Sequence, residues 1–176
     1  MMTRECTVII VTLFLTACGQ STNSDLKIPD KPVPASDSRT AIITYDTAQH
    51  WIFRNDTPAT LSTKEINDIE DILKLFVAEY NAAQEKYIAE TQLKLPDHKL
   101  ANEDFMIELK NYSRQYVPVI NAKGEKEIWV NCFCIISGTD WRERVVIVDD
   151  GGKCFFNLKV NLTTRTYYDE SVNGEA

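Results

Sequence analysis

Histidine and glycine are scarce in this chain of 176 residues, which contains two histidines and six glycines. His50 and His98 are too far apart to form the paired spacing of a zinc-binding helix, and the glycines form no phosphate-binding loop. No serine lies in the Gly-x-Ser-x-Gly turn of an α/β-hydrolase. The sequence therefore carries no common signature of a zinc enzyme, a nucleotide-binding protein or a serine hydrolase, and we expect neither a metal nor a cofactor.

Positive charge is also sparse. The chain has 19 Lys and Arg against 26 Asp and Glu, a net charge of −7 at pH 7, and its basic residues do not cluster. Proteins that bind nucleic acid or anionic lipid surfaces need a basic patch. We therefore expect no nucleic-acid partner and no adsorption to a membrane through charge.

A hydrophobic run long enough to span a membrane is missing as well. The apolar stretch at residues 7–17 has about eleven residues, and a spanning helix needs roughly 20. A run of this length after Arg4 is typical of a signal peptide, although Glu5 weakens the positive charge of such a leader. The segment Leu15-Thr16-Ala17-Cys18 resembles the lipobox of bacterial lipoproteins, in which small residues precede a cysteine that is acylated before cleavage.

The lipobox resemblance implies an order of segments along the chain. Residues 1–17 would be a signal peptide that is removed, and Cys18 would carry the acyl chains that attach the protein to a membrane. Residues 18–40 would form a flexible tether, because prolines and polar residues dominate there. Gly19 replaces the aspartate that keeps enterobacterial lipoproteins at the inner membrane, which favours the outer membrane, facing the periplasm. A single domain would follow at residues 41–176.

One helix is strongly indicated after Leu61. Ser62 and Glu65 have the spacing of a capping box, and Leu61 can pack on Ile66 as a hydrophobic staple. Apolar residues then recur at intervals of three and four, which predicts one long amphipathic helix of about 25 to 30 residues ending before Pro96. The stripe consists of Ile66, Ile69, Leu73, Phe76, Val77, Tyr80, Ala83 and Tyr87.

Beyond Tyr112 the apolar period changes to two, which is typical of antiparallel strands. Turn residues at 121–124, 137–141 and 150–152 separate the segments. The predicted strands are residues 113–121, 126–137, 142–149, 153–162 and 165–172. A long helix followed by such strands resembles the cystatin-like architecture. We therefore predict an α+β fold, with one helix packed on a curved antiparallel meander of four to five strands.

The predicted domain contains three cysteines, because Cys6 would be removed with the signal peptide and Cys18 would be acylated. They are Cys132, Cys134 and Cys154. Alternation places all three on core-facing sides of their strands. If residues 142–149 form an intervening strand, Cys132 and Cys154 lie about 9.6 Å apart, too far for a disulfide. We favour three buried free thiols. The alternatives are a disulfide made by a bulge or another register, and a metal or redox site.

The second face of the predicted sheet is also apolar and must be covered or used. Trp129, Phe133 and Phe155 lie on this face, interleaved with Asn131 and Asn157. The favoured expectation is that residues 41–60 fold across it. The alternative is that part of the face is a docking surface, where aromatic and amide side chains anchor a protein or a glycan.

These patterns predict a lipid-anchored envelope protein that acts as a non-catalytic binding or assembly module. Its expected partners are the membrane, through the lipid, and an envelope protein or glycan. Its candidate binding residues are Trp129, Asn131, Phe133, Phe155 and Asn157. The alternative function is an envelope hydrolase or a thiol-dependent enzyme, which a cleft containing His50 or His98 near two carboxylates would favour.

Overall fold

The helix predicted after Ser62 is present as α1, Thr63–Lys94. The computed structural model describes residues 39–54, 56–97, 99–135 and 140–174, so the lipobox, Cys18 and most of the tether lie outside the described residues. The capping box is formed, with the Glu65 amide donating to Ser62 Oγ and the Glu65 carboxylate accepting from the Ser62 amide. α1 has 32 residues, slightly more than predicted, and ends before Pro96.

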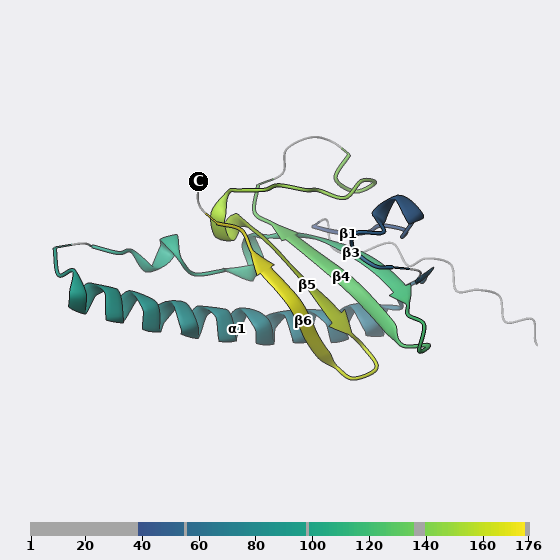
Figure 1. Cartoon of the computed structure of the whole chain (residues 1–176), viewed down its shortest axis with the longest axis horizontal. Helices are drawn as coiled ribbons and strands as arrows, with labels where there is room; N and C mark the ends of the chain where they lie inside the picture. The colour runs from purple at the N-terminus through teal and green to yellow at the C-terminus, as the bar shows by residue number, and fades with distance from the viewer. Residues whose placement is uncertain (1–38, 55, 98, 136–139, 175–176) are drawn as a thin grey trace, which may run out of the picture.

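A single sheet packs on α1 and has six strands in the described residues. The antiparallel meander is confirmed for four strands, β3 to β6, while β1 runs parallel to β3 and makes the sheet mixed. β1 and β2 both pair with β3, and β6 forms the other edge (Figure 1). The strands are β1 (Thr40–Ile42), β2 (Thr57–Pro58), β3 (Ser113–Ile120), β4 (Lys126–Phe133), β5 (Phe155–Asn161) and β6 (Thr166–Val172).

Four short 3-10 helices lie in the described connections. They are η1 (Thr47–Gln49), η2 (Asn102–Asp104), η3 (Leu109–Asn111) and η4 (Gly152–Cys154). None of the described helices is long and apolar enough to cross a membrane.

The prediction of a strand at residues 142–149 is wrong. These residues belong to the connection between β4 and β5, here called the β4–β5 loop (residues 134–154), and β4 pairs directly with β5. Its described residues 140–151 cross the face of the sheet opposite α1 (Figure 1). The predicted turn at 150–152 therefore joins no pair of strands. Gly151, with φ of 91°, instead leads into η4.

The inner face of the sheet, which packs on α1, carries the main core. Strand alternation correctly predicted that Cys132 on β4 faces inward, and it is buried in one cluster with Phe156 of β5. On α1 the predicted stripe is buried in its middle part, at Ile69, Leu73, Phe76 and Val77, and Ile66 and Tyr80 are partly buried against the same core. Ala83 and Tyr87 are exposed, and the helix continues beyond the sheet (Figure 1). The buried helix residues are Ile69, Ile72, Leu73, Phe76, Val77 and Ile88.

The outer face, opposite α1, carries a second core. Ile43, Tyr45, Ile52 and Phe53 are buried in one cluster with Trp129 of β4. This arrangement confirms the expectation that residues within 41–60 fold across the face. The β4–β5 loop completes the cover, with Trp141 buried in the same cluster. The domain thus has three layers: α1, the sheet, and an outer cover made of two segments far apart in sequence.

Candidate functional site: a neutral pocket on the outer face

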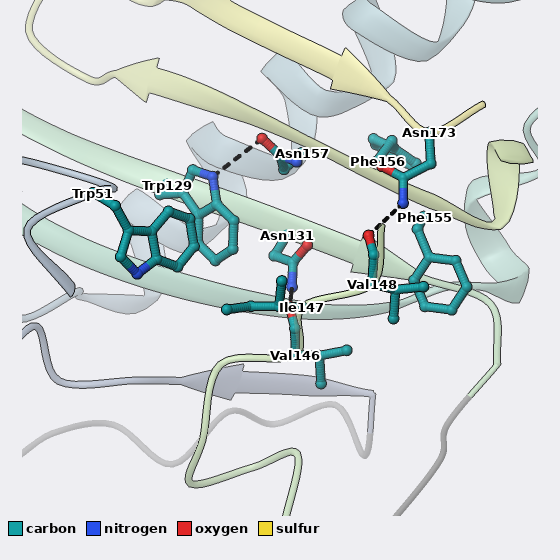
Figure 2. Close-up of a pocket in the computed structure, with 10 residues that line it drawn as sticks. All are labelled: Trp51, Trp129, Asn131, Val146, Ile147, Val148, Phe155, Phe156, Asn157 and Asn173. Carbon is teal, nitrogen blue, oxygen red and sulfur yellow. Dashed lines mark hydrogen bonds between the residues drawn. The ribbon is translucent and has the colours of Figure 1, made fainter. Parts of the chain in front are cut away.

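A small pocket opens where the two segments of the outer cover meet the sheet. Its volume is about 80 Å³. Figure 2 shows Trp51 on one side, the residues of the β4–β5 loop on another, and β4 and β5 behind. The lining residues are Trp51, Trp129, Asn131, Val146, Ile147, Val148, Phe155, Phe156, Asn157 and Asn173.

Four of the five binding residues predicted from the sequence lie at this pocket. Trp129, Asn131, Phe155 and Asn157 all line it, and Asn131 lies directly opposite Asn157 in the pairing of β4 with β5. Phe133 does not line it. Its ring is 1% exposed and packs edge-on to Trp141, with ring centroids 5.6 Å apart.

Two indole rings form the left wall of the pocket in Figure 2. Trp129 is 5% exposed, and Trp51 is 51% exposed. The rings meet edge to face, with centroids 5.5 Å apart and an interplanar angle of 85° (Figure 2). Trp129 is therefore part of the outer core, while Trp51 leaves an apolar surface at the rim that a ligand can contact.

Two carboxamides form the polar part of the wall. Asn131 Nδ2 donates to Gln115 Oε1 (3.1 Å) and to the Val146 carbonyl (2.8 Å), while Asn157 Oδ1 accepts from Trp129 Nε1 (3.2 Å). A carbonyl only accepts and an indole N–H only donates, so both amide orientations are fixed. Among the described residues, Asn131 Oδ1 and Asn157 Nδ2 have no hydrogen-bond partner. The pocket therefore presents one free acceptor and one free donor.

Gln115 of β3 fixes the loop that forms the third wall. It is fully buried, and its Oε1 accepts from the Val146 amide (2.8 Å), while its Nε2 donates to the carbonyls of Arg144 (2.6 Å) and Trp141. These bonds explain why residues 142–149 form no strand. Side-chain amides of β3 and β4, and not a neighbouring strand, bond the Val146 amide and carbonyl and the Arg144 carbonyl.

Asn173, just after β6, holds the same loop from the other side. Its Nδ2 donates to the Val148 carbonyl (2.6 Å) (Figure 2) and to the Asp150 carbonyl (2.9 Å). Sequence reasoning missed Asn173, although an asparagine before Gly174 is a turn signal. It also assigned Trp51 only to the cover and Ile147 to a strand, whereas both line the pocket.

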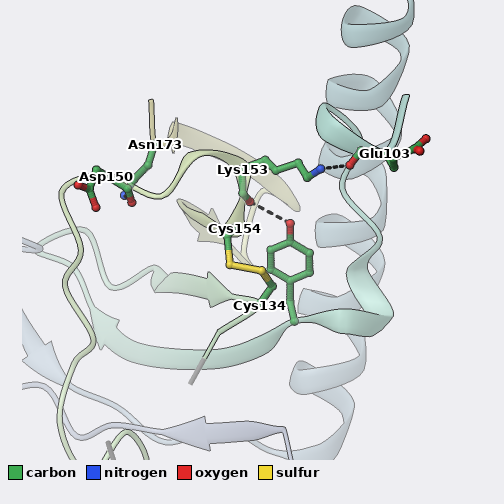
Figure 3. Close-up of a disulfide and its surroundings, with 7 residues drawn as sticks. Glu103, Cys134, Asp150, Lys153, Cys154 and Asn173 are labelled. Carbon is green, nitrogen blue, oxygen red and sulfur yellow. Dashed lines mark hydrogen bonds between the residues drawn. A yellow bond between two sulfur atoms is a disulfide. The ribbon is translucent and has the colours of Figure 1, made fainter. Parts of the chain in front are cut away.

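A disulfide joins the two ends of the β4–β5 loop. Cys134 and Cys154 are bonded, with their Cα atoms 5.1 Å apart, and the Cys134 amide donates to the Cys154 carbonyl (3.0 Å) (Figure 3). The expectation of three buried free thiols is therefore wrong, because two of them are bonded and Cys134 is exposed. With no strand between β4 and β5, Phe133 pairs with Phe155, and the next residues outward are Cys134 and Cys154.

Cys132 is the free cysteine of the described residues, and it is buried in the inner core. Burial raises the pKa of its thiol well above the ordinary value, so the nucleophilic thiolate is disfavoured. No group of three His, Cys, Asp or Glu side chains that could hold a metal ion occurs in the described residues. Of the three cysteines in the described residues, one is thus a buried thiol and two are joined in a disulfide.

A larger cavity of about 530 Å³ lies beside the disulfide. Its wall includes Glu103, Lys153 and Tyr112, whose hydroxyl donates to the Lys153 carbonyl (2.9 Å). Burial raises the pKa of Tyr112 to about 12, so its hydroxyl stays protonated. The described residues place no histidine at this cavity. His50 is exposed, and His98 lies outside the described residues.

Comparisons of the chain with family models, with curated proteins and with solved structures found no match.

Proposed function

We propose that this chain is a lipid-anchored protein of the bacterial envelope that acts as a non-catalytic binding or assembly module, with the outer-face pocket as its binding site. The resemblance of residues 15–18 to a lipobox supports acylation at Cys18, and Gly19, in place of the aspartate that retains enterobacterial lipoproteins at the inner membrane, favours the outer membrane, facing the periplasm. The polar, proline-containing stretch that follows supports a tether that lets the domain reach a partner.

One observation carries the proposal of binding: none of the ten residues that line the pocket has an ionisable side chain. General acid–base catalysis and nucleophilic catalysis both need a group that gains or loses a proton or forms a bond. Indole rings and unpartnered carboxamides supply instead what recognition needs, an apolar contact area with a few directed hydrogen bonds. This chemistry supports a partner that is held and released unchanged.

Cosedimentation with an isolated cell-envelope fraction tests this function. The acylated full chain is solubilised in detergent, reconstituted into vesicles of neutral lipid, and mixed with the envelope fraction. We expect wild type to bind and Trp51→Ala to lose most of the binding. The matched control is Leu93→Ala, because Leu93 is 85% exposed on α1 and lies outside the pocket. Equal binding by wild type and Trp51→Ala would contradict the proposed site.

A further inference from the structure

We propose that the ligand of the outer-face pocket is a neutral glycan, held by one hydroxyl group between Asn131 and Asn157, an inference that rests on the binding function proposed above. Three features of the pocket support this inference. They are a free donor and a free acceptor on neighbouring side chains, the small volume of the pocket, and the exposed indole at its rim.

The two free amide atoms match a hydroxyl group. Asn131 and Asn157 are directly opposite each other on β4 and β5, a position where Cβ atoms lie about 5 Å apart. A hydroxyl both donates and accepts, so one oxygen bound between the two side chains donates to Asn131 Oδ1 and accepts from Asn157 Nδ2. Both amide atoms gain a partner from this single group, which a ligand with only acceptors or only donors cannot provide.

The size of the pocket limits what enters it. Pockets that enclose a whole small ligand have roughly 300 Å³ or more, whereas this pocket has about 80 Å³. Only one edge of a sugar ring fits, and the rest of the ring lies outside. Hydroxyl groups on a ring edge are the regular feature of glycans, whereas a peptide presents them only on occasional side chains.

The rim provides a surface for the remainder of the ring. Trp51 is 51% exposed and stands beside the pocket (Figure 2). One face of a pyranose ring carries mainly C–H groups, and covering them with an indole removes apolar area from water. The glycan should be neutral, because no cationic side chain lines the pocket and the chain has a net charge of −7.

The first test follows the indole N–H signals of the full chain in detergent by nuclear magnetic resonance. The chain has three tryptophans, so Trp→Phe variants assign the signals. The probes are cellotetraose and maltotetraose, both neutral and both with vicinal diols, and a neutral peptide without Ser, Thr or Tyr is the comparison. We expect the oligosaccharides to shift the signals of Trp51 and Trp129 and to leave that of Trp141 in place, because Trp141 does not line the pocket.

Asn157→Asp tests the hydroxyl directly. This variant keeps an oxygen for Trp129 Nε1 but removes the free N–H donor, and we expect it to weaken oligosaccharide binding at least tenfold. Asn67→Asp is the control, because it makes the same change at an exposed position of α1. Unchanged indole signals of Trp141 in both variants will show that the fold is retained. Equal binding by Asn157→Asp and wild type would overturn the assignment.

The second test separates this inference from the proposed function. The envelope fraction is treated with periodate, which destroys vicinal diols of sugars, or with protease, and cosedimentation is repeated. We expect periodate to abolish binding and protease to leave it. If protease abolishes binding and the oligosaccharides shift no indole signal, the partner is a protein, so the glycan inference is wrong and the binding function stands. If the untreated fraction does not bind at all, both fail.

Discussion

Trp51 and Trp129 meet edge to face on the outer side of the sheet, with ring centroids 5.5 Å apart, yet one ring is half exposed and the other is buried. The contact joins the outer core to the rim of the pocket. The two tryptophans therefore have separable roles, one in recognition and one mainly in stability.

Substitution of each tryptophan should show this division. Trp129→Ala leaves a cavity in the outer core and should lower the free energy of unfolding by about 3 to 5 kcal/mol. Trp51→Ala removes a half-exposed ring and should cost under about 1 kcal/mol. Urea denaturation followed by circular dichroism measures both. Similar losses for the two variants would refute the division.

The disulfide makes a prediction about thiol titration. In a chain carrying Cys6→Ser and Cys18→Ser, three cysteines remain, and denatured, non-reduced protein should titrate as one thiol, that of Cys132. The folded protein should react slowly, because burial holds the pKa of Cys132 well above its ordinary value. Three titratable thiols in the non-reduced protein would show that Cys134 and Cys154 are unpaired.

Gln115 should control the order of the β4–β5 loop. Gln115→Ala removes the partners of the Val146 amide and of the Arg144 carbonyl. Each buried polar group that loses its hydrogen-bond partner costs up to about 3 kcal/mol of stability. We expect a loss of about 2–3 kcal/mol, with faster hydrogen exchange confined to residues 141–148. Asn121→Ala, in the β3–β4 turn, is a control that should not change exchange in this loop. Unchanged exchange in Gln115→Ala would show that the loop is held by other contacts.

Acylation at Cys18 is the prediction on which the envelope location depends. Mass spectrometry of protein extracted from bacterial membranes should find an N-terminus at Cys18 carrying acyl chains. Cys18→Ser should leave the uncleaved precursor. Recovery of an unmodified chain that begins at Met1 or Met2 would contradict the proposed anchoring.

The local patterns that predicted the fold correctly are those whose cause lies within a few residues. The capping box at Ser62 and Glu65 and the turn at Asn121 and Gly124 are both formed, because each is made by neighbouring side chains and backbone. Strand alternation likewise assigned Trp129 and Phe133 to the outer face and Cys132 to the inner face.

The errors come from contacts between distant residues. Val145 to Val148 is a β-branched run that locally favours a strand, but Gln115 and Asn131, which are 15 to 31 residues away, bind its backbone. Once that strand is removed, β4 pairs with β5 and the disulfide follows. The pocket could be anticipated from aromatic and amide residues on one face, but its loop wall and Trp51 required the tertiary structure.

The most direct test of the central claim, that the outer-face pocket is the binding site, is photo-crosslinking in living cells. A photoreactive amino acid replaces Ile147, which is 65% exposed at the pocket, or Leu93 as the control on α1. We predict a crosslinked product from position 147 that disappears when Asn157→Asp is added, and none from position 93. Crosslinking from position 93 alone, or a product at 147 that Asn157→Asp leaves unchanged, would contradict the claim.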